Sequence, residues 1–319
     1  MQVKNLAAID LGTNDCRLVV ADQKGKRIFR QTEQVRLGEG LAKQGNFSSQ
    51  AMERGWQCLA QYARLMRENH VDRYRAIATA SCRMAENSAQ FVQMVEELSG
   101  IKLEVISPLE EAVLTLKGAL LNADRQKPYV LVFDIGGGST EMTLATNEEC
   151  PRILYTVSIP LGARTAAEKY DILEYDDAKV IKLQDEIKQH VQSFLINADF
   201  LRYKKQCHCL ATSSVPLRLA SMIENRKTYE RDEVDGKTFA IDRFYEAIRQ
   251  VYHMTLVEME QNPHIGEKRA PIFVASCVIF ATICRILQID ALTSSLKGAQ
   301  EAVIMDLVSN EKAGIKWQS

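Results

Sequence analysis

Apolar and polar positions along the chain alternate with two periods, one typical of strands and one typical of helices. Three apolar runs at 6–11, 17–21 and 27–37, separated by turn residues, predict an antiparallel meander. From 52 to 66 the apolar positions recur with a helical period, and 74–79 is expected to be another strand. The chain therefore begins as a mixture of strands and helices.

The next segment carries stop and start signals for helices. A helix is expected at 81–98, stopped by Gly100, and a strand at 101–106. Ser107 then fits an N-cap, and Pro108 the first helical position, of a helix that ends near 122.

The second half repeats the opening pattern. After the polar segment 124–128, strands are expected at 129–133, 141–145, 152–158 and 207–211, and helices at 176–202, from about 242 and after Pro271. Strands and helices alternate in both halves, so the fold class is α/β or α+β with layered sheets. The 319 residues are about twice the usual domain size, so two domains are expected, at 1–124 and 125–319.

Composition narrows the function classes. The chain has 40 Lys and Arg against 41 Asp and Glu, a balance that argues against a nucleic-acid or membrane-surface partner. The most apolar stretch, 270–284, is shorter than the roughly 20 residues of a membrane span. The eight cysteines show no paired spacing and no secretory leader is evident, so free thiols and a cytoplasmic protein are expected.

Two distant segments of the chain, residues 7–14 and 131–138, resemble each other, and this similarity indicates where the functional site lies. In each, an apolar strand delivers an aspartate, Asp10 or Asp134, into a glycine-containing turn from which a second strand leaves. This echo predicts two similarly folded domains that present equivalent turns to each other across a cleft. Plain hairpin turns are the alternative. That alternative is the stronger for the first turn taken alone, whereas three consecutive glycines favour function in the second.

Glycines let backbone N–H groups converge on an anion, because a positive φ costs glycine nothing and no Cβ blocks the ligand. The expected phosphate-binding positions are Gly12, Thr13, Asn14, Gly136, Gly137, Gly138, Ser139 and Thr140. An aspartate beside a phosphate would be repelled unless a divalent cation lay between them. Asp10 and Asp134 are therefore expected to be metal ligands.

Five runs occur together with these turns: 9–14 (IDLGTN), 36–41 (RLGEGL), 78–83 (ATASCR), 110–112 (EEA) and 134–141 (DIGGGSTE). In this order they resemble the exopolyphosphatase/guanosine pentaphosphatase family of the actin, sugar kinase and acetate kinase superfamily. The resemblance implies a ribonuclease H-like fold in each half. It also implies Mg²⁺-dependent hydrolysis of terminal phosphoanhydride bonds in polyphosphate, guanosine pentaphosphate or both. Members of this family often pair, so a homodimer is compatible with it.

The resemblance also assigns roles. Glu111 matches the family's general base, Asp134 and Glu141 its Mg²⁺ ligands, and Arg83 an arginine on the substrate phosphates. From the residues alone, Glu111 could be a solvated glutamate at a helix start, Arg83 a surface arginine and Glu141 a strand-edge carboxylate. Glu110 is expected to be structural, closing a capping box with Ser107.

Several positions depart from the family pattern. Asp15 adds negative charge beside the first turn, Val113 replaces an arginine, and the turn at 211–216 contains no glycine. Residues 297–302 also lack an expected arginine and a second glycine. These departures motivate an alternative function: a polyphosphate or guanosine-polyphosphate binding or sensor protein with weakened turnover. A kinase of the superfamily is a third hypothesis, disfavoured by the missing glycines.

Overall fold

The computed structural model describes residues 4–309 and 315–316. The chain divides into two units, Met1–Gly118 with Ala299–Ser319 (unit 1) and Ala119–Gly298 (unit 2). The boundary at Gly118/Ala119 lies before the one expected at 124/125. The last helix, moreover, belongs to unit 1, although the sequence assigned all of 125–319 to the second domain.

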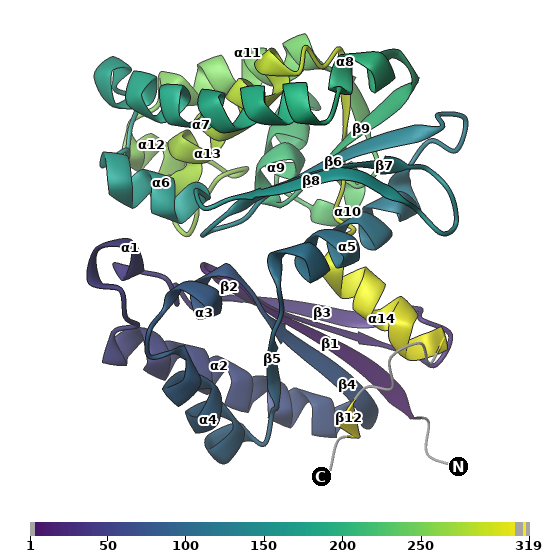
Figure 1. Cartoon of the computed structure of the whole chain (residues 1–319). Coiled ribbons are helices and arrows are strands. Elements are labelled where there is room, and N and C mark those ends of the chain that lie inside the picture. Colours follow the sequence, from purple (N-terminus) through teal and green to yellow (C-terminus); the bar gives the residue numbers. More distant parts are fainter. Residues whose placement is uncertain (1–3, 310–314, 317–319) are drawn as a thin grey trace. The chain divides into compact units, whose positions relative to one another are not determined.

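Unit 1 is built on a mixed sheet with the strand order β12-β4-β1-β2-β3, in which β5 also pairs with β4 (Figure 1). Strands β1, β2 and β3 form the expected antiparallel meander, and β4 runs parallel to β1. Its strands are β1 (Asn5–Leu11), β2 (Asp15–Ala21), β3 (Arg27–Gln34), β4 (Val71–Ala78), β5 (Leu103–Val105) and β12 (Ile315–Lys316). Its helices are α1 (Leu41–Gln44), α2 (Ser49–Glu68), α3 (Ala80–Met84), α4 (Ser88–Ser99), α5 (Pro108–Ala119) and α14 (Ala299–Ser309).

The alternation of side chains along β1 divides the core of unit 1 into two layers. Ala7, Ile9 and Leu11 pack on the face covered by α2 and α4. Leu6 and Ala8 pack with α14 on the opposite face. Asp10 shares the parity of Leu6 and Ala8, so the strand presents it on the α14 face. The apolar side of α14 thus explains why the C-terminal helix belongs to this sheet.

Unit 2 contains a second mixed sheet, ordered β10-β11-β9-β6-β7-β8. Its strands are β6 (Tyr129–Ile135), β7 (Thr140–Thr146), β8 (Ile153–Ile159), β9 (Cys207–Thr212), β10 (Thr238–Ala240) and β11 (Ala291–Ser294). Its helices are η1 (Leu120–Asn122), α6 (Ala163–Tyr170), α7 (Asp177–Asn197), α8 (Phe200–Tyr203), η2 (Lys204–Gln206), α9 (Ser214–Ile223), α10 (Arg231–Val234), α11 (Ile241–Tyr252), α12 (Leu256–Gln261) and α13 (Ala270–Ile286).

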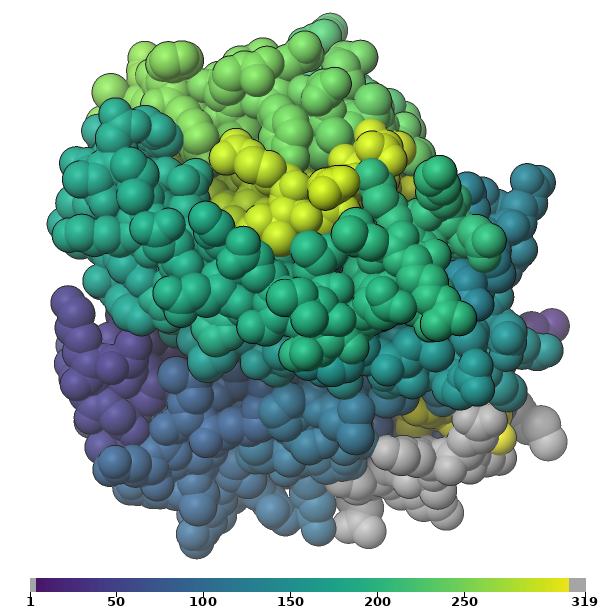
Figure 2. All heavy atoms as spheres, turned by 45° about the horizontal axis from the view of Figure 1, so that its top comes forward, coloured from purple at the N-terminus to yellow at the C-terminus, as the bar shows by residue number. Residues whose placement is uncertain are grey.

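Helix α13 is the centre of the unit 2 core. It is apolar nearly all round and buried from Ala270 to Cys284 except at Pro271, as expected for a helix enclosed by other elements. Figure 1 shows α6, α7, α12 and α13 on one side of β6, β7 and β8. The segment after α13 reaches the surface among green helices in Figure 2. Leu131, Phe133 and Ile135 face this core, so Val132 and Asp134 face the other side of the sheet.

Two expected helices are interrupted. The helix predicted at 81–98 is split into α3 and α4, because Ala85 is extended and Asn87 bonds the backbone of Phe47 in both directions, at 2.8 and 3.0 Å. The helix predicted at 176–202 ends at Asn197, because Asp199 adopts a positive φ of 47° before α8. In both cases a local contact or turn overrides an apolar pattern that continues beyond it.

The structure also bears on two expectations from composition, about membrane-spanning helices and about the cysteines. Within the part of the chain that the structure describes, no helix has the length and apolarity needed to cross a bilayer. All eight cysteines are free, and seven of them are buried.

Candidate functional site

Each of the two glycine turns contains an equivalent internal hydrogen bond. In unit 1 the Gly12 amide donates to the carbonyl of Asp15, and in unit 2 the Gly136 amide donates to the carbonyl of Ser139, both at 2.9 Å. Each turn joins an antiparallel pair of strands, and each first strand has a parallel neighbour on its other side, β4 or β9. The echo in the sequence is thus a repeat of structure.

The reason for glycine at these turns is space rather than a positive φ. Neither Gly12 nor Gly136 is among the residues with positive φ, contrary to the expectation from the sequence. A Cβ on Gly12 would lie 3.3 Å from the carbonyl oxygen of Asp15, and one on Gly136 would lie 3.1 Å from that of Ser139. The missing side chain therefore permits the close backbone approach across each turn.

Backbone amides at the start of helix α6 donate hydrogen bonds to the carbonyl groups of the glycine loop in unit 2. The Ala163 amide donates to Gly136 O at 2.8 Å, and the Arg164 and Thr165 amides donate to Gly137 O at 2.9 and 3.2 Å. A Cβ on Gly162, just before the helix, would lie 2.6 Å from Gly136 O, and the Thr165 hydroxyl donates to Gly138 O at 3.3 Å, so helix and loop are in close contact.

The loop amides have no such partners. Among the hydrogen bonds of the described residues, none has the backbone amide of Gly137, Gly138 or Ser139 as its donor. Backbone N–H groups without an acceptor in the protein are donors that an anion could use.

Two carboxylates lie opposite each other beside this loop. The register of the β6–β7 pair places Asp134 directly across from Glu141, on the same face of the sheet. Glu141 is 4% exposed, and its Oε1 accepts hydrogen bonds from the Ser139 hydroxyl at 2.6 Å and the Ser158 hydroxyl at 2.8 Å. The hydroxyl of Thr140, expected to bind substrate, donates instead to the carbonyl of Leu161 at 2.8 Å.

The turn of unit 1 is electrostatically different. Arg17 lies across from Asp10 and approaches it at 3.2 Å, and it also lies 3.8 Å from Asp15. Asn14 donates from its side chain to Asp15 at 3.1 Å. The negative charge that Asp15 adds is therefore offset by a neighbouring arginine. Thr13 packs tightly against Gly38, where a Cβ would come within 2.2 Å of its methyl group.

The adjacent glutamates at the start of α5 are held by two different arginines. Ser107 caps the helix by accepting from the Glu110 amide at 3.1 Å. The Glu110 carboxylate lies 2.7 Å from Nη2 of Arg75, and Glu111 lies 2.8 Å from Nη1 of Arg83. Burial alone would lower the pKa of Arg75, but its hydrogen bonds to Glu104 and Glu110 outweigh this effect and raise it.

Arg83 and Glu111 thus come together from separate elements, α3 and α5, at 18% and 13% side-chain exposure. Arg83 also donates to the carbonyl of Ile106 at 3.0 Å, which fixes its direction. Burial raises the pKa of the neighbouring Cys82 to about 12, so this thiol adds no charge beside the pair.

Four contributors to these sites were missed from the sequence: Arg17, Arg75, Ser158 and α6 with Thr165. The available signal for α6 was Gly162 followed three residues later by a hydroxyl, since Thr165 accepts from the Gly162 amide at 2.8 Å. Within the described ranges 4–309 and 315–316, no cluster of three or more His, Cys, Asp or Glu is positioned to hold a metal.

The turn after β9 keeps a glycine-like backbone without a glycine. Ser213 has φ 87° and ψ −179°, a region that is otherwise occupied almost only by glycine. The hydroxyls of Thr212 and Ser213 are buried and lack hydrogen-bond partners. The departure at 211–216 therefore changes the residue type while the strained turn remains.

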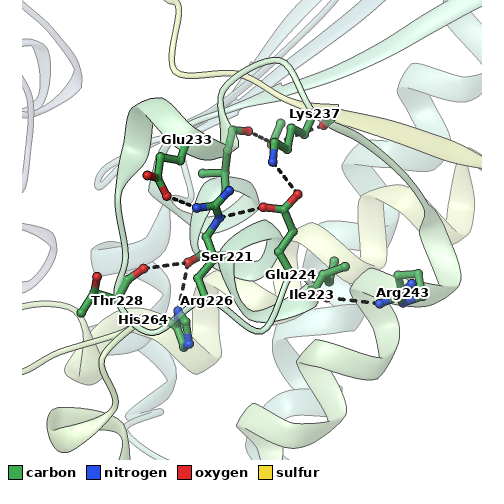
Figure 3. Close-up of polar contacts among 11 residues, drawn as sticks. Ser221, Ile223, Glu224, Arg226, Thr228, Glu233, Lys237, Arg243 and His264 are labelled. Carbon is green, nitrogen blue, oxygen red and sulfur yellow. Dashed lines mark hydrogen bonds and ion pairs between the residues drawn. The ribbon is translucent and has the colours of Figure 1, made fainter.

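A separate polar network in unit 2 ties α9 to the loops around it (Figure 3). Ser221 bonds Nδ1 of His264 at 3.0 Å, and Glu224 joins Arg226 at 2.7 Å and Lys237 at 2.6 Å. These groups satisfy one another, which is typical of a network that holds loops in place.

Comparison with known proteins decides the family. The model of the Ppx/GppA phosphatase family matches residues 18–311. The chain belongs to the Ppx/GppA phosphatase family. Solved structures agree on the fold: an exopolyphosphatase from Cytophaga hutchinsonii superposes with a TM-score of 0.87 at 20% identity, covering 98% of this chain and 100% of that one. An Aquifex aeolicus Ppx/GppA family member gives 0.77 at 23% identity, with 98% and 100% covered.

A curated relative is similar over a shorter region. The bifunctional 3-dehydroquinate synthase/phosphatase of Fusobacterium nucleatum is 32% identical over 201 residues, which are 58% of this chain and 30% of that protein. The chain thus spans less than a third of that relative. The α/β fold with two mixed sheets, expected from the sequence, is shared with these solved structures.

Proposed function

We propose that this Ppx/GppA family protein hydrolyses the terminal phosphoanhydride bond of inorganic polyphosphate, guanosine pentaphosphate or both. The observation that carries the proposal is the glycine loop of unit 2, whose amides at Gly137, Gly138 and Ser139 have no acceptor among the described residues while α6 occupies its carbonyls. Such a loop recognises phosphate oxygens through geometry and partial charge. The two carboxylates beside the loop, Asp134 and Glu141, offer ligands for the metal ion that a phosphatase uses. A protein that only binds anions has no need of such a pair.

The residues present fit a magnesium ion. Asp134 and Glu141 offer carboxylate oxygens, the ligands that Mg²⁺ prefers, from paired positions on one face of the sheet. They would hold the ion, which when bound would neutralise charge on the phosphate oxygens. Asp10 of unit 1 was also predicted to be a metal ligand and stays so; its carboxylate lies 3.2 Å from Arg17.

The proposed general base is a residue of unit 1. Glu111 is the proposed general base, which takes the proton of the attacking water, and its pairing with Arg83 at 2.8 Å fixes the direction of the carboxylate. Arg83 has two further nitrogen atoms in its planar guanidinium with which to bind phosphate oxygens in a bidentate manner. The arginine can therefore serve both the base and the substrate.

Phosphate release by the purified protein, from polyphosphate and from guanosine pentaphosphate in separate assays, tests the proposal. Glu111→Gln keeps the shape of the side chain and is expected to lower the rate about 10²–10⁴-fold. Full activity in this variant would eliminate the base. Calorimetric binding of either compound without phosphate release would favour the binding or sensor protein instead.

A further inference from the structure

Ser158 of β8 lies directly across from Glu141 of β7 in the antiparallel register. Its hydroxyl donates to Oε1 of Glu141 at 2.8 Å, and the Ser139 hydroxyl donates to the same oxygen at 2.6 Å. We propose that Ser158 is a positioning residue that sets the orientation of the Glu141 carboxylate for hydrolysis. This inference rests on the function proposed above.

Two donors on one oxygen restrict the carboxylate in a way that one donor does not. The last torsion of a glutamate is broad and weakly held by rotamer preference alone. Ser139 approaches Oε1 from the glycine loop and Ser158 approaches it from the neighbouring strand, so rotation about this torsion would break at least one hydrogen bond.

The position of Ser158 makes this contact independent of the loop. Ser139 belongs to the turn that is proposed to bind phosphate. When substrate binds, its hydroxyl can therefore donate to a phosphate oxygen and no longer to Glu141. Ser158 lies within a strand pair whose register runs from Thr140 opposite Ile159 to Ala145 opposite Ile153, one position in from its Thr140 end. The sheet therefore keeps one donor on Glu141 whatever the loop does.

The same two strands provide a matched control. Thr156 lies two residues before Ser158 and thus on the same face, and its hydroxyl bonds that of Thr143 at 2.8 Å. This pair resembles Ser158 and Glu141 in strand position and distance, but contains no acid. Removing the Thr156 hydroxyl measures how much the rate of phosphate release falls when β8 loses a hydroxyl that does not contact an acid.

The kinetic test compares Ser158→Ala, Ser158→Thr and Thr156→Val in phosphate release from polyphosphate. Hydrogen bonds to charged groups are strong, so Ser158→Ala is expected to lower kcat about tenfold while KM changes less than about twofold. Ser158→Thr keeps the hydroxyl and is expected to recover most of the rate, and Thr156→Val to keep the rate of the unaltered protein. Equal rates in Ser158→Ala and the unaltered protein, or equal losses in all three variants, would overturn the proposal.

A second measurement needs no activity. Urea unfolding of Ser158→Ala, Glu141→Met and the double variant forms a cycle, with Glu141→Gln replacing Glu141→Met if the latter does not fold. A contact between the two residues predicts that the double variant loses less stability than the sum of the single losses. Additive losses would refute the contact. Non-additive losses in a protein that releases no phosphate would refute the hydrolysis, and with it the kinetic role of Ser158, but confirm that Ser158 holds Glu141.

Discussion

Arg17 occupies in unit 1 the register position that Glu141 occupies in unit 2. Each lies across an antiparallel strand pair from the aspartate that precedes the glycine turn, Arg17 from Asp10 and Glu141 from Asp134. The repeated hairpin therefore carries an acid–base pair in one copy and an acid–acid pair in the other.

This difference gives the two hairpins different local charge. Paired carboxylates repel each other unless a positive charge lies near, whereas Arg17 already compensates Asp10 and Asp15 at 3.2 and 3.8 Å. The proposed magnesium site uses Asp134 and Glu141, which lie opposite each other in the strand register.

Gly162→Ala is predicted to damage the phosphate loop without touching a charged group. The added Cβ would lie 2.6 Å from Gly136 O and 2.7 Å from Ser139 N, both backbone atoms that cannot turn aside. We expect a loss of about 2 kcal/mol or more in the free energy of unfolding, typical of overpacking, with weaker phosphate binding. Urea unfolding and phosphate calorimetry measure the two effects.

Gly298→Ala is the matched control for this variant, because a Cβ at Gly298 would meet no atom within 4 Å. It is expected to change stability by less than about 0.5 kcal/mol. Equal behaviour of the two variants would show that the close contact between Gly162 and the loop is unimportant.

Arg75→Met is predicted to destabilise unit 1. Arg75 is 4% exposed and bonds Glu104 and Glu110, so its removal leaves two carboxylates near each other. Since both glutamates are partly exposed, water compensates in part, and a loss of about 2 kcal/mol is expected in urea unfolding. Lys102→Met removes a more exposed pair with Glu96 and is expected to cost less than about 0.5 kcal/mol. Similar losses would contradict a special role for Arg75.

The sequence predicted most strands and both hairpins, because alternation and turn residues are local signals. It missed α6 and the break between α3 and α4, since α6 docks on the distant Gly136–Gly137 backbone and the break depends on Asn87 binding Phe47. Among the candidate site residues, those inside the family's motifs were proposed from the sequence. Arg17 and Ser158 were missed because their roles arise from strand register, and register is set by pairing between segments that local patterns do not specify.

Ser213→Gly is predicted to stabilise the protein. Ser213 is held at φ 87° and ψ −179°, at a cost of about 1–3 kcal/mol for a residue with a side chain. Glycine relieves that strain but gains backbone freedom in the unfolded chain, which offsets about 0.5–1 kcal/mol. The expected net gain is about 1 kcal/mol in urea unfolding. Ser214→Gly, one residue on and within α9, should instead lose stability, and a gain in both variants would refute the strain.

The stability of unit 2 should depend on pH through His264. Its burial and the neighbouring charge of Arg218 lower the pKa of His264 below its usual value of about 6.5, so the folded state holds the neutral ring that bonds Ser221. The unfolded chain then binds more protons, and stability falls as the pH drops below about 6.5. His264→Asn keeps a short polar side chain but cannot gain this proton. The variant should therefore lose less midpoint temperature than the unaltered protein between pH 7 and pH 5, and equal losses would show that His264 does not titrate in this range.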